Sequence, residues 1–403
     1  TQMPSGKPLW APRVGFNWDV HGDKTLQVRG GTGIFTGRFP FVWLNNQIAN
    51  PNFYFYQTVD PEFQWPQVWR TSLGIDKKFE GGWVLTGDFS YTKDLNGAHV
   101  QNWGITTPSG TLQGPDSRPI YTSDDYANFM QNANYVFTNT DKGRIYNASV
   151  KIQKSFDNGL YLQAAYNYLN AKDVNSIEAE ITGDAFAFNP VVGDANSDVL
   201  GFSKYGDRNR IIAVVSKGWN YGKDNRWGTT ISAFGEYAQG GRFSYTYGGD
   251  INGDGSNLND LLYIPTESEI NEMNWAGSRQ GEEFNKFIEQ DSYLNENRGS
   301  YMERYGALAP WRGRWDIKWL QDFKVNDKNR VQFSMDILNF GNLLNSDWGL
   351  VQQPNVVQPV GVSVDDAGVP TYSFTGENQS TFVYDSSLAS RWQMQIGLRY
   401  IFN

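Results

Sequence analysis

The sequence predicts an all-β fold in which about eleven strands form part of a transmembrane antiparallel β-barrel with long external loops. Three observations support this fold class. Apolar and polar side chains alternate over segments of about ten residues, the length that a tilted strand needs to cross a bilayer. Short and long connections follow one another in turn along the chain. Aromatic residues make up 15% of the chain, and such rings gather at the two membrane interfaces of outer-membrane barrels.

The last strand shows the alternation most clearly, because residues 391–402 read RWQMQIGLRYIF. A period of two places Met394, Ile396 and Leu398 on one face, and Gln395 and Arg399 on the other. This run is longer than the strands of about 5–6 residues that are usual in globular proteins. We therefore expect the first set to face lipid and the second set to face the lumen or a plug.

The same alternation recurs along the rest of the chain. It predicts strands at 11–20, 24–35, 67–79, 83–94, 143–156, 160–171, 208–219, 227–239, 310–323, 329–341 and 390–402. Short connections such as EGG at 80–82 and DNG at 157–159 favour tight hairpin turns. Long connections without much secondary structure are uncommon in compact domains, and here they cover 36–66, 95–142, 172–207, 240–309 and 342–389.

The sorting of short and long connections fixes the predicted topology. The final strand follows a long external loop, so it runs inward and leaves the C-terminus in the periplasm. An odd number of antiparallel strands leaves both edges open, and unpaired edges cannot sit in lipid. We therefore expect residues 1–403 to be the C-terminal portion of a single barrel domain. The plug and the N-terminal strands would come from an upstream segment or from another chain.

Composition excludes several classes of function. The sequence contains no cysteine, so thiol metal sites are excluded. It contains two histidines, far apart along the chain, which argues against a histidine-dependent catalytic triad. A formal net charge of −9 argues against nucleic acid as a partner. No apolar stretch approaches the ~20 residues of a membrane helix. The sequence does not suggest an enzyme.

The sharpest local motif is DINGDG at 250–255. Asp250, Asn252 and Asp254 occupy positions 1, 3 and 5 of a calcium loop, and Gly255 supplies the turn at position 6. The glutamate expected at position 12 is missing. The spacing of the three oxygen-bearing side chains still predicts a calcium (Ca²⁺) site formed by Asp250, Asn252 and Asp254, with Asp260 completing it. The alternative is a polar Asx turn that needs no metal.

Other loop segments are weaker candidates. The segment GDANSD places Asp194, Asn196 and Asp198 in a second oxygen-rich patch. Aromatic runs at 41–46 and 52–57 could stack on a ligand or pack on other loops. Residues 266–307 have helical character and are expected to form short helices over the pore mouth. No ligand-binding residue can be assigned.

Several segments resemble a known family. The segment APRVGFNWDVHGDKTLQVRGGTGIFTGRFP is similar to the PRxGF and RGGxGxF pattern of TonB-dependent outer-membrane transporters. The segments KGRIYNASVKIQKSFDNGLYLQAAYNY, YGDRNRIIAV, GGRFSYTYGGDINGDGSNLNDLLYIP and FSMDILNFGNLLN resemble the Oar-like branch of that family from Bacteroidota. The resemblance spans nearly the whole chain. It is most specific in the glycine-rich strand pair, the loop around DINGDG and the last strand.

The resemblance implies a barrel of 22 strands, of which this chain would supply half. It also implies ligand capture by extracellular loops and uptake energised by the TonB complex in a Gram-negative outer membrane. The implied partners are outer-membrane lipid, the remainder of the barrel with its plug, and a surface lipoprotein. Two other hypotheses remain: a structural or adhesive barrel subunit without transport, and a soluble glycan-binding β protein. Peptide, oligosaccharide and metal chelate all remain open as ligands.

Overall fold

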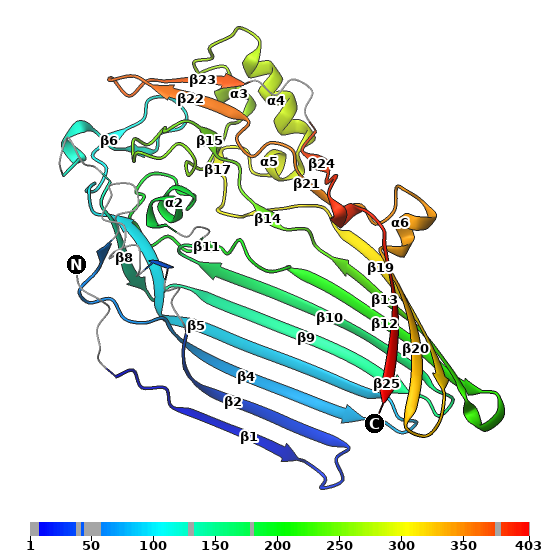
Figure 1. Cartoon of the computed structure of the whole chain (residues 1–403). Coiled ribbons are helices and arrows are strands. Elements are labelled where there is room, and N and C mark those ends of the chain that lie inside the picture. Colours follow the sequence, from blue (N-terminus) through cyan, green and yellow to red (C-terminus); the bar gives the residue numbers. More distant parts are fainter. Residues whose placement is uncertain are drawn as a thin grey trace.

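One large antiparallel sheet runs through the computed structural model (Figure 1), which describes residues 8–37, 42–43, 58–127, 133–177, 181–374 and 380–402. Its strands pair in the order in which they occur along the chain, and all of the predicted strands are present. These strands are β1 Arg13–Asp19, β2 Leu26–Thr36, β4 Gln67–Lys78, β5 Val84–Asn102, β9 Arg144–Ser155, β10 Leu160–Asp173, β12 Asn209–Tyr221, β13 Trp227–Ala238, β19 Arg312–Lys324, β20 Asn329–Leu338 and β25 Gln393–Phe402.

The register gives the sheet one apolar face and one polar face. Ile75 pairs with Val28 on one side and with Gly87 on the other. Farther along the sheet, Ile211 pairs with Tyr166 and with Tyr237. Because paired residues point to the same side, all of these residues share the apolar face. Its side chains are exposed, since Ile75 keeps 47% and Ile211 keeps 42% of their surface.

Aromatic side chains form two belts on the apolar face. One belt lies where the long connections leave the sheet, here called the loop end. The other lies at the opposite, turn end. Between them the face is mainly aliphatic. The loop-end belt contains Trp69, Tyr91, Tyr146, Tyr166, Tyr237, Trp311 and Trp315, and the turn-end belt contains Trp18, Trp219, Tyr221, Trp227, Phe323, Tyr400 and Phe402. Two aromatic girdles flanking an apolar band are typical of outer-membrane barrels.

The polar face is held by cross-strand ion pairs. Arg29 lies 3.0 Å from Asp76 and 2.7 Å from Asp88. The strand between Arg29 and Asp88 contributes Gly74, where a Cβ atom would collide with the Arg29 guanidinium. The glycine therefore lets one arginine reach across a strand. Farther along the sheet, Lys318 on β19 forms an ion pair with Asp336 on β20 at 2.7 Å.

The tight turns form as the sequence predicts. Gly22, Gly81 and Gly159 have φ values of +76°, +81° and +81° in the connections β1–β2, β4–β5 and β9–β10. Tight hairpin turns require positive φ values, and glycine adopts them without steric strain because it has no Cβ atom. At the β19–β20 turn, the Asn326 carboxamide oxygen accepts a hydrogen bond from the Lys328 backbone N–H at 2.9 Å.

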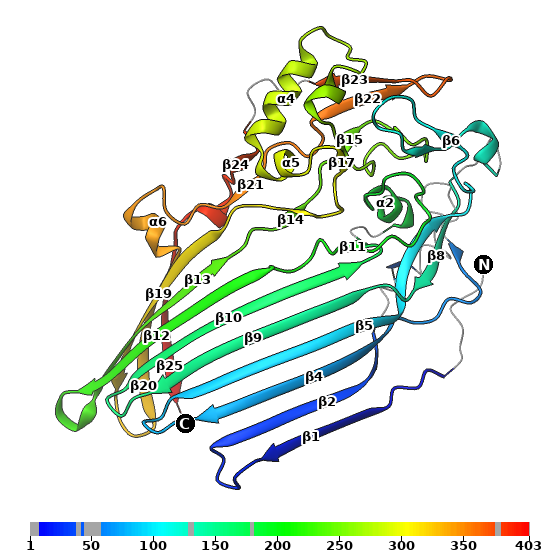
Figure 2. The ribbon, with the colours of Figure 1, turned by 180° about the vertical axis from the view of Figure 1, so that it is seen from behind.

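The long connections fold together into a layer over the loop end of the sheet (Figure 2). Short strand pairs and helices build this loop layer, and the predicted helical character of 266–307 is confirmed. Its elements include β6 Gly110–Thr111, β7 Pro119–Ile120, β8 Tyr135–Thr140, α2 Thr182–Ala187, β14 Arg242–Phe243, β15 Tyr247–Gly248, β16 Tyr263–Ile264, α3 Glu267–Ile270, α4 Gln280–Gln290, α5 Ser292–Glu296, β17 Ser300–Tyr301, β18 Ala307–Leu308, β21 Gln352–Pro354, β22 Val360–Val364, β23 Pro370–Phe374 and β24 Phe382–Tyr384.

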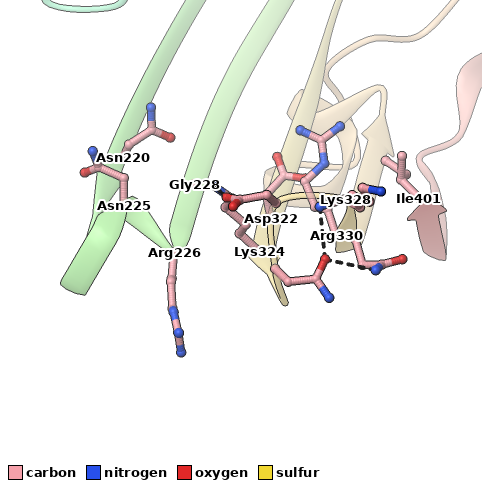
Figure 3. A pocket seen from close by; sticks show the side chains of 12 residues that line it. Asn220, Asn225, Arg226, Gly228, Asp322, Lys324, Lys328, Arg330 and Ile401 are labelled. Atoms are coloured by element: carbon pink, nitrogen blue, oxygen red, sulfur yellow. Dashed lines mark hydrogen bonds and ion pairs between the residues drawn. The ribbon is translucent and has the colours of Figure 1, made fainter. Parts of the chain in front are cut away.

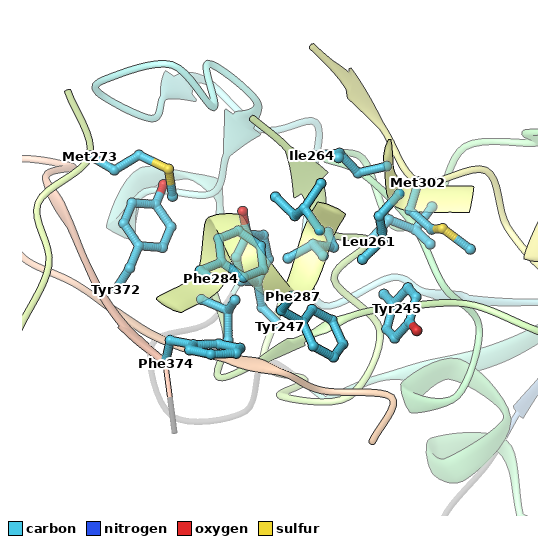
Figure 4. Packing of buried hydrophobic residues seen from close by; sticks show 14 of the residues in the cluster. Tyr245, Tyr247, Leu261, Ile264, Met273, Phe284, Phe287, Met302, Tyr372 and Phe374 are labelled. Carbon is cyan, nitrogen blue, oxygen red and sulfur yellow. The ribbon is translucent and has the colours of Figure 1, made fainter. Parts of the chain in front are cut away.

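The buried core lies in this loop layer and not in the sheet. One cluster packs α4 against β16 and β23 through Phe284, Ile264 and Phe374 (Figure 4). A second cluster surrounds Phe137 on β8, against which Trp43 stacks at 5.0 Å. The loop layer is therefore an ordered, packed body. Of the predicted aromatic segments, 52–57 and all of 41–46 except 42–43 lie outside the described residues.

One detail differs from the sequence-based expectation. The predicted strand 83–94 continues to Asn102 as β5, and its last residues pair with β8 inside the predicted loop 95–142. This extension forms because β8, which buries Phe137 in the second cluster, offers β5 a new partner beyond β9. Among the described residues, β1 and β25 each pair with one strand of the sheet and not with each other. No helix in the described part is long and apolar enough to span a bilayer.

Candidate functional site

The DINGDG segment folds as a tight loop between β15 and β16 in the loop layer. The Asp250 carboxylate organises it, because Oδ1 accepts the Gly253 N–H at 2.6 Å and Oδ2 accepts the Gly255 N–H at 2.9 Å. Gly253 and Gly255 have φ values of +78° and +92°, which other residues rarely adopt. The expected sharp turn at Gly255 is therefore present.

The Asp254 carboxylate lies inside the loop and is 2% exposed. Its Oδ1 accepts the Ser256 N–H at 2.8 Å. Its Oδ2 accepts the carboxamide N–H groups of Asn259 at 2.8 Å and Asn252 at 3.2 Å. Asn252 also donates to the Gly193 carbonyl at 3.0 Å. Three donors thus hold this buried carboxylate, and within the described part of the chain no cationic side chain forms an ion pair with it.

Asp260, the fourth predicted ligand, is engaged by a different partner. Its Oδ1 lies 3.2 Å from Nη1 of Arg118, and its Oδ2 accepts the Ile251 N–H at 3.1 Å. Arg118 also contacts Asp116 at 2.9 Å and donates to the Leu261 carbonyl at 2.6 Å. Arg118 and Asp260 are fully buried. This ion triad ties the 95–142 connection to the 240–309 connection.

The donor chemistry of the loop fits a hard cation in part. Calcium prefers carboxylate and carbonyl oxygens, and the buried Asn259 Oδ1 has no hydrogen-bond partner among the described residues. In the same residues, however, no group of three or more histidine, cysteine, aspartate or glutamate side chains is arranged to hold a metal ion. The assignment of Asp250, Asn252, Asp254 and Asp260 to a metal therefore stays a prediction.

The electrostatics of the loop show an excess of buried negative charge. Burial, and secondly the nearby Asp250, raises the pKa of Asp254 to about 6. Burial also raises the pKa of Asp260 well above its usual range, although Arg118 opposes this shift. The pKa of Asp250 is raised by burial as well. A buried carboxylate without a cation is costly, so a proton or a cation would stabilise this loop.

This excess charge predicts a pH dependence in calcium-free buffer. Burial raises the pKa of Asp254 to about 6 in the folded loop from its usual value of 3.8, so the folded state binds this proton more tightly than the unfolded chain does. The stability of the loop layer should therefore fall as the pH rises from about 4 to about 6 and level off above. Hydrogen exchange within 240–309 measures this slope. Asp254→Asn should make it shallower, and an unchanged slope would contradict the assignment.

The second oxygen-rich segment lies beside the first. The Asp194 carboxylate accepts the Tyr121 hydroxyl at 3.2 Å and the Asn196 N–H at 2.9 Å. Asn196 clamps the end of β5, because it both accepts from the Asn102 N–H and donates to the Asn102 carbonyl, at 2.7 and 2.8 Å. Asp198 lies 3.6 Å from Nε2 of His99. In this structure these side chains therefore connect the 172–207 connection to the end of β5 and to the 95–142 connection.

Sequence reasoning missed the residues that join these loops. Arg118 and Tyr121 lie in the 95–142 connection, far along the chain from Asp260 and Asp194. His99 is fully buried and lies beside Asp198. Its pKa is lowered by burial, against the opposing effect of Asp198. No local pattern marks any of these residues, because their partners come from other loops.

Two hollows lie at opposite ends of the strands. A cavity of about 370 Å³ in the loop layer is lined mainly by apolar residues, among them Val174, Val191 and Met302, with Arg304 and Glu303 also present. A polar hollow of about 320 Å³ lies at the turn end (Figure 3). It is lined by Asn220, Asn225, Arg226, Gly228, Asp322, Lys324, Asn326, Asp327, Lys328, Asn329, Arg330 and Ile401. The first is the better candidate for a ligand, because pockets for small molecules are mostly apolar with few polar groups.

Comparison with solved structures shows what fold this chain shares. The outer-membrane transporter YddB from Escherichia coli superposes with a TM-score of 0.50 and 10% identity, over 97% of this chain and 40% of that one. BauA, the ferric preacinetobactin receptor from Acinetobacter baumannii, superposes with a TM-score of 0.42 and 12% identity, over 97% of this chain and 36% of that one. FpvA from P. aeruginosa, bound to pyoverdines, superposes with a TM-score of 0.41 and 10% identity, over 97% of this chain and 33% of that one. No family model and no curated protein matches the sequence.

This likeness concerns the fold alone. The chain spans about 40% of the length of the transporter it matches at a TM-score of 0.50. Its sheet has the strand pairing expected for the wall of an outer-membrane barrel, which confirms the predicted fold class. The matched proteins are transporters and receptors.

Proposed function

We propose that the chain forms part of the wall and loop layer of a TonB-dependent outer-membrane receptor. In this function, the loops capture a ligand outside the cell, and energised uptake follows. The observation that carries the proposal is the exposed apolar face with its two aromatic belts, opposite a polar face of ion pairs. Water would disfavour such a face, whereas lipid covers it.

The open edges of the sheet support a larger barrel. Within the described residues, β1 and β25 each leave one edge without a strand partner. Unpaired backbone groups are costly in lipid, so further strands of the same or another chain would close the wall. The family resemblance adds a plug, the TonB complex and a surface lipoprotein as partners. In this arrangement the loop layer is extracellular and the C-terminus is periplasmic.

The loop layer supplies the surface for ligand capture. Its packed cores hold the loops in place, and the 370 Å³ cavity offers a mainly apolar site between them. The ligand class stays open between peptide, oligosaccharide and metal chelate. The finer assignment to the Oar-like branch of Bacteroidota rests on the sequence motifs and belongs to this proposal.

The alternative is a structural or adhesive barrel subunit without transport. Co-purification from native membranes separates the two functions. Transport requires that the full-length protein be recovered with TonB, and that a protonophore block its uptake of ligand. We expect both. Recovery of the protein in a stable envelope assembly without TonB, with growth under nutrient limitation unchanged by its deletion, would favour the structural function.

We also propose that calcium binds at the DINGDG loop, with Asp250, Asn252 and Asp254 as ligands and Asp260 completing the site. The support is the buried excess of carboxylates and the unpartnered Asn259 oxygen. The ion would stabilise the loop layer and take no part in chemistry. It would be bound by oxygens at about 2.3–2.6 Å.

Chelation should therefore loosen the loop layer. Removal of calcium is expected to speed protease cleavage within 240–309, and re-addition should reverse it. Asp254→Asn should abolish this calcium effect. Asp366→Asn, which alters an exposed carboxylate in the β22–β23 turn, serves as the control and should keep it. Cleavage that is the same with and without calcium would leave only the hydrogen-bonded turn.

A further inference from the structure

The segment that follows β20 forms a small apolar shelf beside the loop-end aromatic belt. It begins at Asn339, continues through α6 Phe340–Leu344 and ends at Gly349. In both ribbon views α6 projects sideways from the ends of β19 and β20, apart from the helices of the loop layer (Figures 1 and 2). Between this segment and β19 lies a groove of about 400 Å³, lined by Trp315, Phe340, Leu344 and Trp348 among others.

Two carboxamides of this segment donate hydrogen bonds to carbonyl groups within it. The Asn342 carboxamide donates to the carbonyls of Ser346 and Trp348, both at 3.0 Å. The Asn339 carboxamide donates to the Gly349 carbonyl at 2.9 Å. Meanwhile Leu344 is 64% and Trp348 is 56% exposed. Polar groups turned inward and apolar groups turned outward are what a chain segment needs in contact with lipid.

The groove continues the apolar face of the sheet. Trp315 shares that face with its partner Gly235, where a Cβ atom would meet the indole ring at 2.6 Å. Next to it, Tyr237 stacks on Trp311 with ring centroids 4.7 Å apart. Aromatic belts lie at the level of the lipid headgroups. The groove therefore opens where the acyl chains of the outer leaflet begin.

Its lining also indicates what kind of molecule it takes. Arg314 is the charged residue among the described residues that line it, and its guanidinium lies 3.9 Å from Glu236 and 3.7 Å from Asp316. The remaining surface is largely hydrocarbon and aromatic. Such a lining offers dispersion contacts to a hydrocarbon chain and little to a charged headgroup.

We propose that this groove holds one acyl chain of an outer-leaflet lipid, so that α6 is a lipid-binding shelf on the barrel wall. The inference rests on the proposed placement of the sheet in the outer membrane. The polar tip formed by Asn345, Ser346 and Asp347 is exposed and lies at the headgroups, while Leu344 and Trp348 contact the chain.

Nitroxide labels test this placement, because the 403 residues contain no cysteine. Single cysteines replace Leu344 in the shelf, Ile396 on the apolar face and Asp366 in the β22–β23 turn of the protein purified from outer membranes. In nanodiscs of defined lipid, labels 344 and 396 should collide mainly with oxygen, and label 366 mainly with a water-soluble nickel chelate. Nickel-accessible labels at both 344 and 396 would contradict the membrane placement itself.

A second measurement tests the bound chain. A lipid with a spin label on its acyl chain should give a motionally restricted component, part of which is lost in Leu344→Asp. Leu398→Ser, on the apolar face outside the groove, is the matched control and should retain it. Nickel access at 344 with oxygen access at 396 would overturn the shelf and leave the barrel intact. Equal spectra for the two variants, or protection of 344 only in native membranes that contain partner proteins, would also overturn it.

Discussion

Replacing Arg118 by methionine is expected to destabilise the loop layer by about 3–5 kcal/mol, because it leaves two buried carboxylates without their cationic partner. Arg118 is fully buried and lies 2.9 Å from Asp116 and 3.2 Å from Asp260. Its guanidinium also lies over the rings of Tyr247 and Tyr301, at 5.2 and 5.4 Å. One side chain thus joins the 95–142 connection to the 240–309 connection.

Hydrogen exchange of the loop-layer amides measures this loss, and strand amides in the same sample provide a reference. Lys286→Met is the control, because Lys286 and its partner Glu282 are 60% and 61% exposed. Exposed pairs contribute little to stability, so its effect should be far smaller. The triple variant with Asp116→Asn and Asp260→Asn should recover part of the loss. Similar protection in the Arg118 and Lys286 variants would contradict this role.

Replacing Ile396 by arginine is expected to destabilise the membrane-inserted barrel by about 2–4 kcal/mol, if Ile396 lies near the bilayer midplane. Ile396 pairs with Met335, and their side chains share the apolar face. The neighbouring Gln395 pairs with Asp336 on the polar face. Gln395→Arg would place a cation beside that carboxylate, so it should cost far less.

Urea-dependent folding into lipid vesicles compares the two variants. The difference in unfolding free energy between Ile396→Arg and Gln395→Arg reports the register directly, because adjacent residues differ only in the face that they occupy. Equal losses would refute the assignment of the two faces.

Local patterning was enough to predict the sheet. The alternation from Arg144 to Ser155 and the positive-φ turn at Gly159 each follow from residues close together in sequence. Side-chain period and turn chemistry are local properties, so the strand order follows once the hairpins are placed. The extension of β5 to Asn102 was missed, because it depends on β8, which arrives from a distant part of the loop.

The loop layer could be predicted only in outline. The DINGDG motif indicated the turn at Gly255 and the oxygen-bearing side chains. The sequence did not indicate that Asp254 is buried, nor that Asp260 pairs with Arg118, 142 residues away. Such contacts depend on how separate loops pack, and no spacing along the chain encodes them. The metal assignment therefore remains a prediction that chelation can test.

Extraction of the native protein from cells tests the central claim most directly. If the apolar face and its two aromatic belts contact lipid, the protein should remain in the outer-membrane fraction through an alkaline wash. It should then enter solution only with detergent. Release into buffer without detergent, as a folded protein, would contradict the barrel function and favour a soluble β protein.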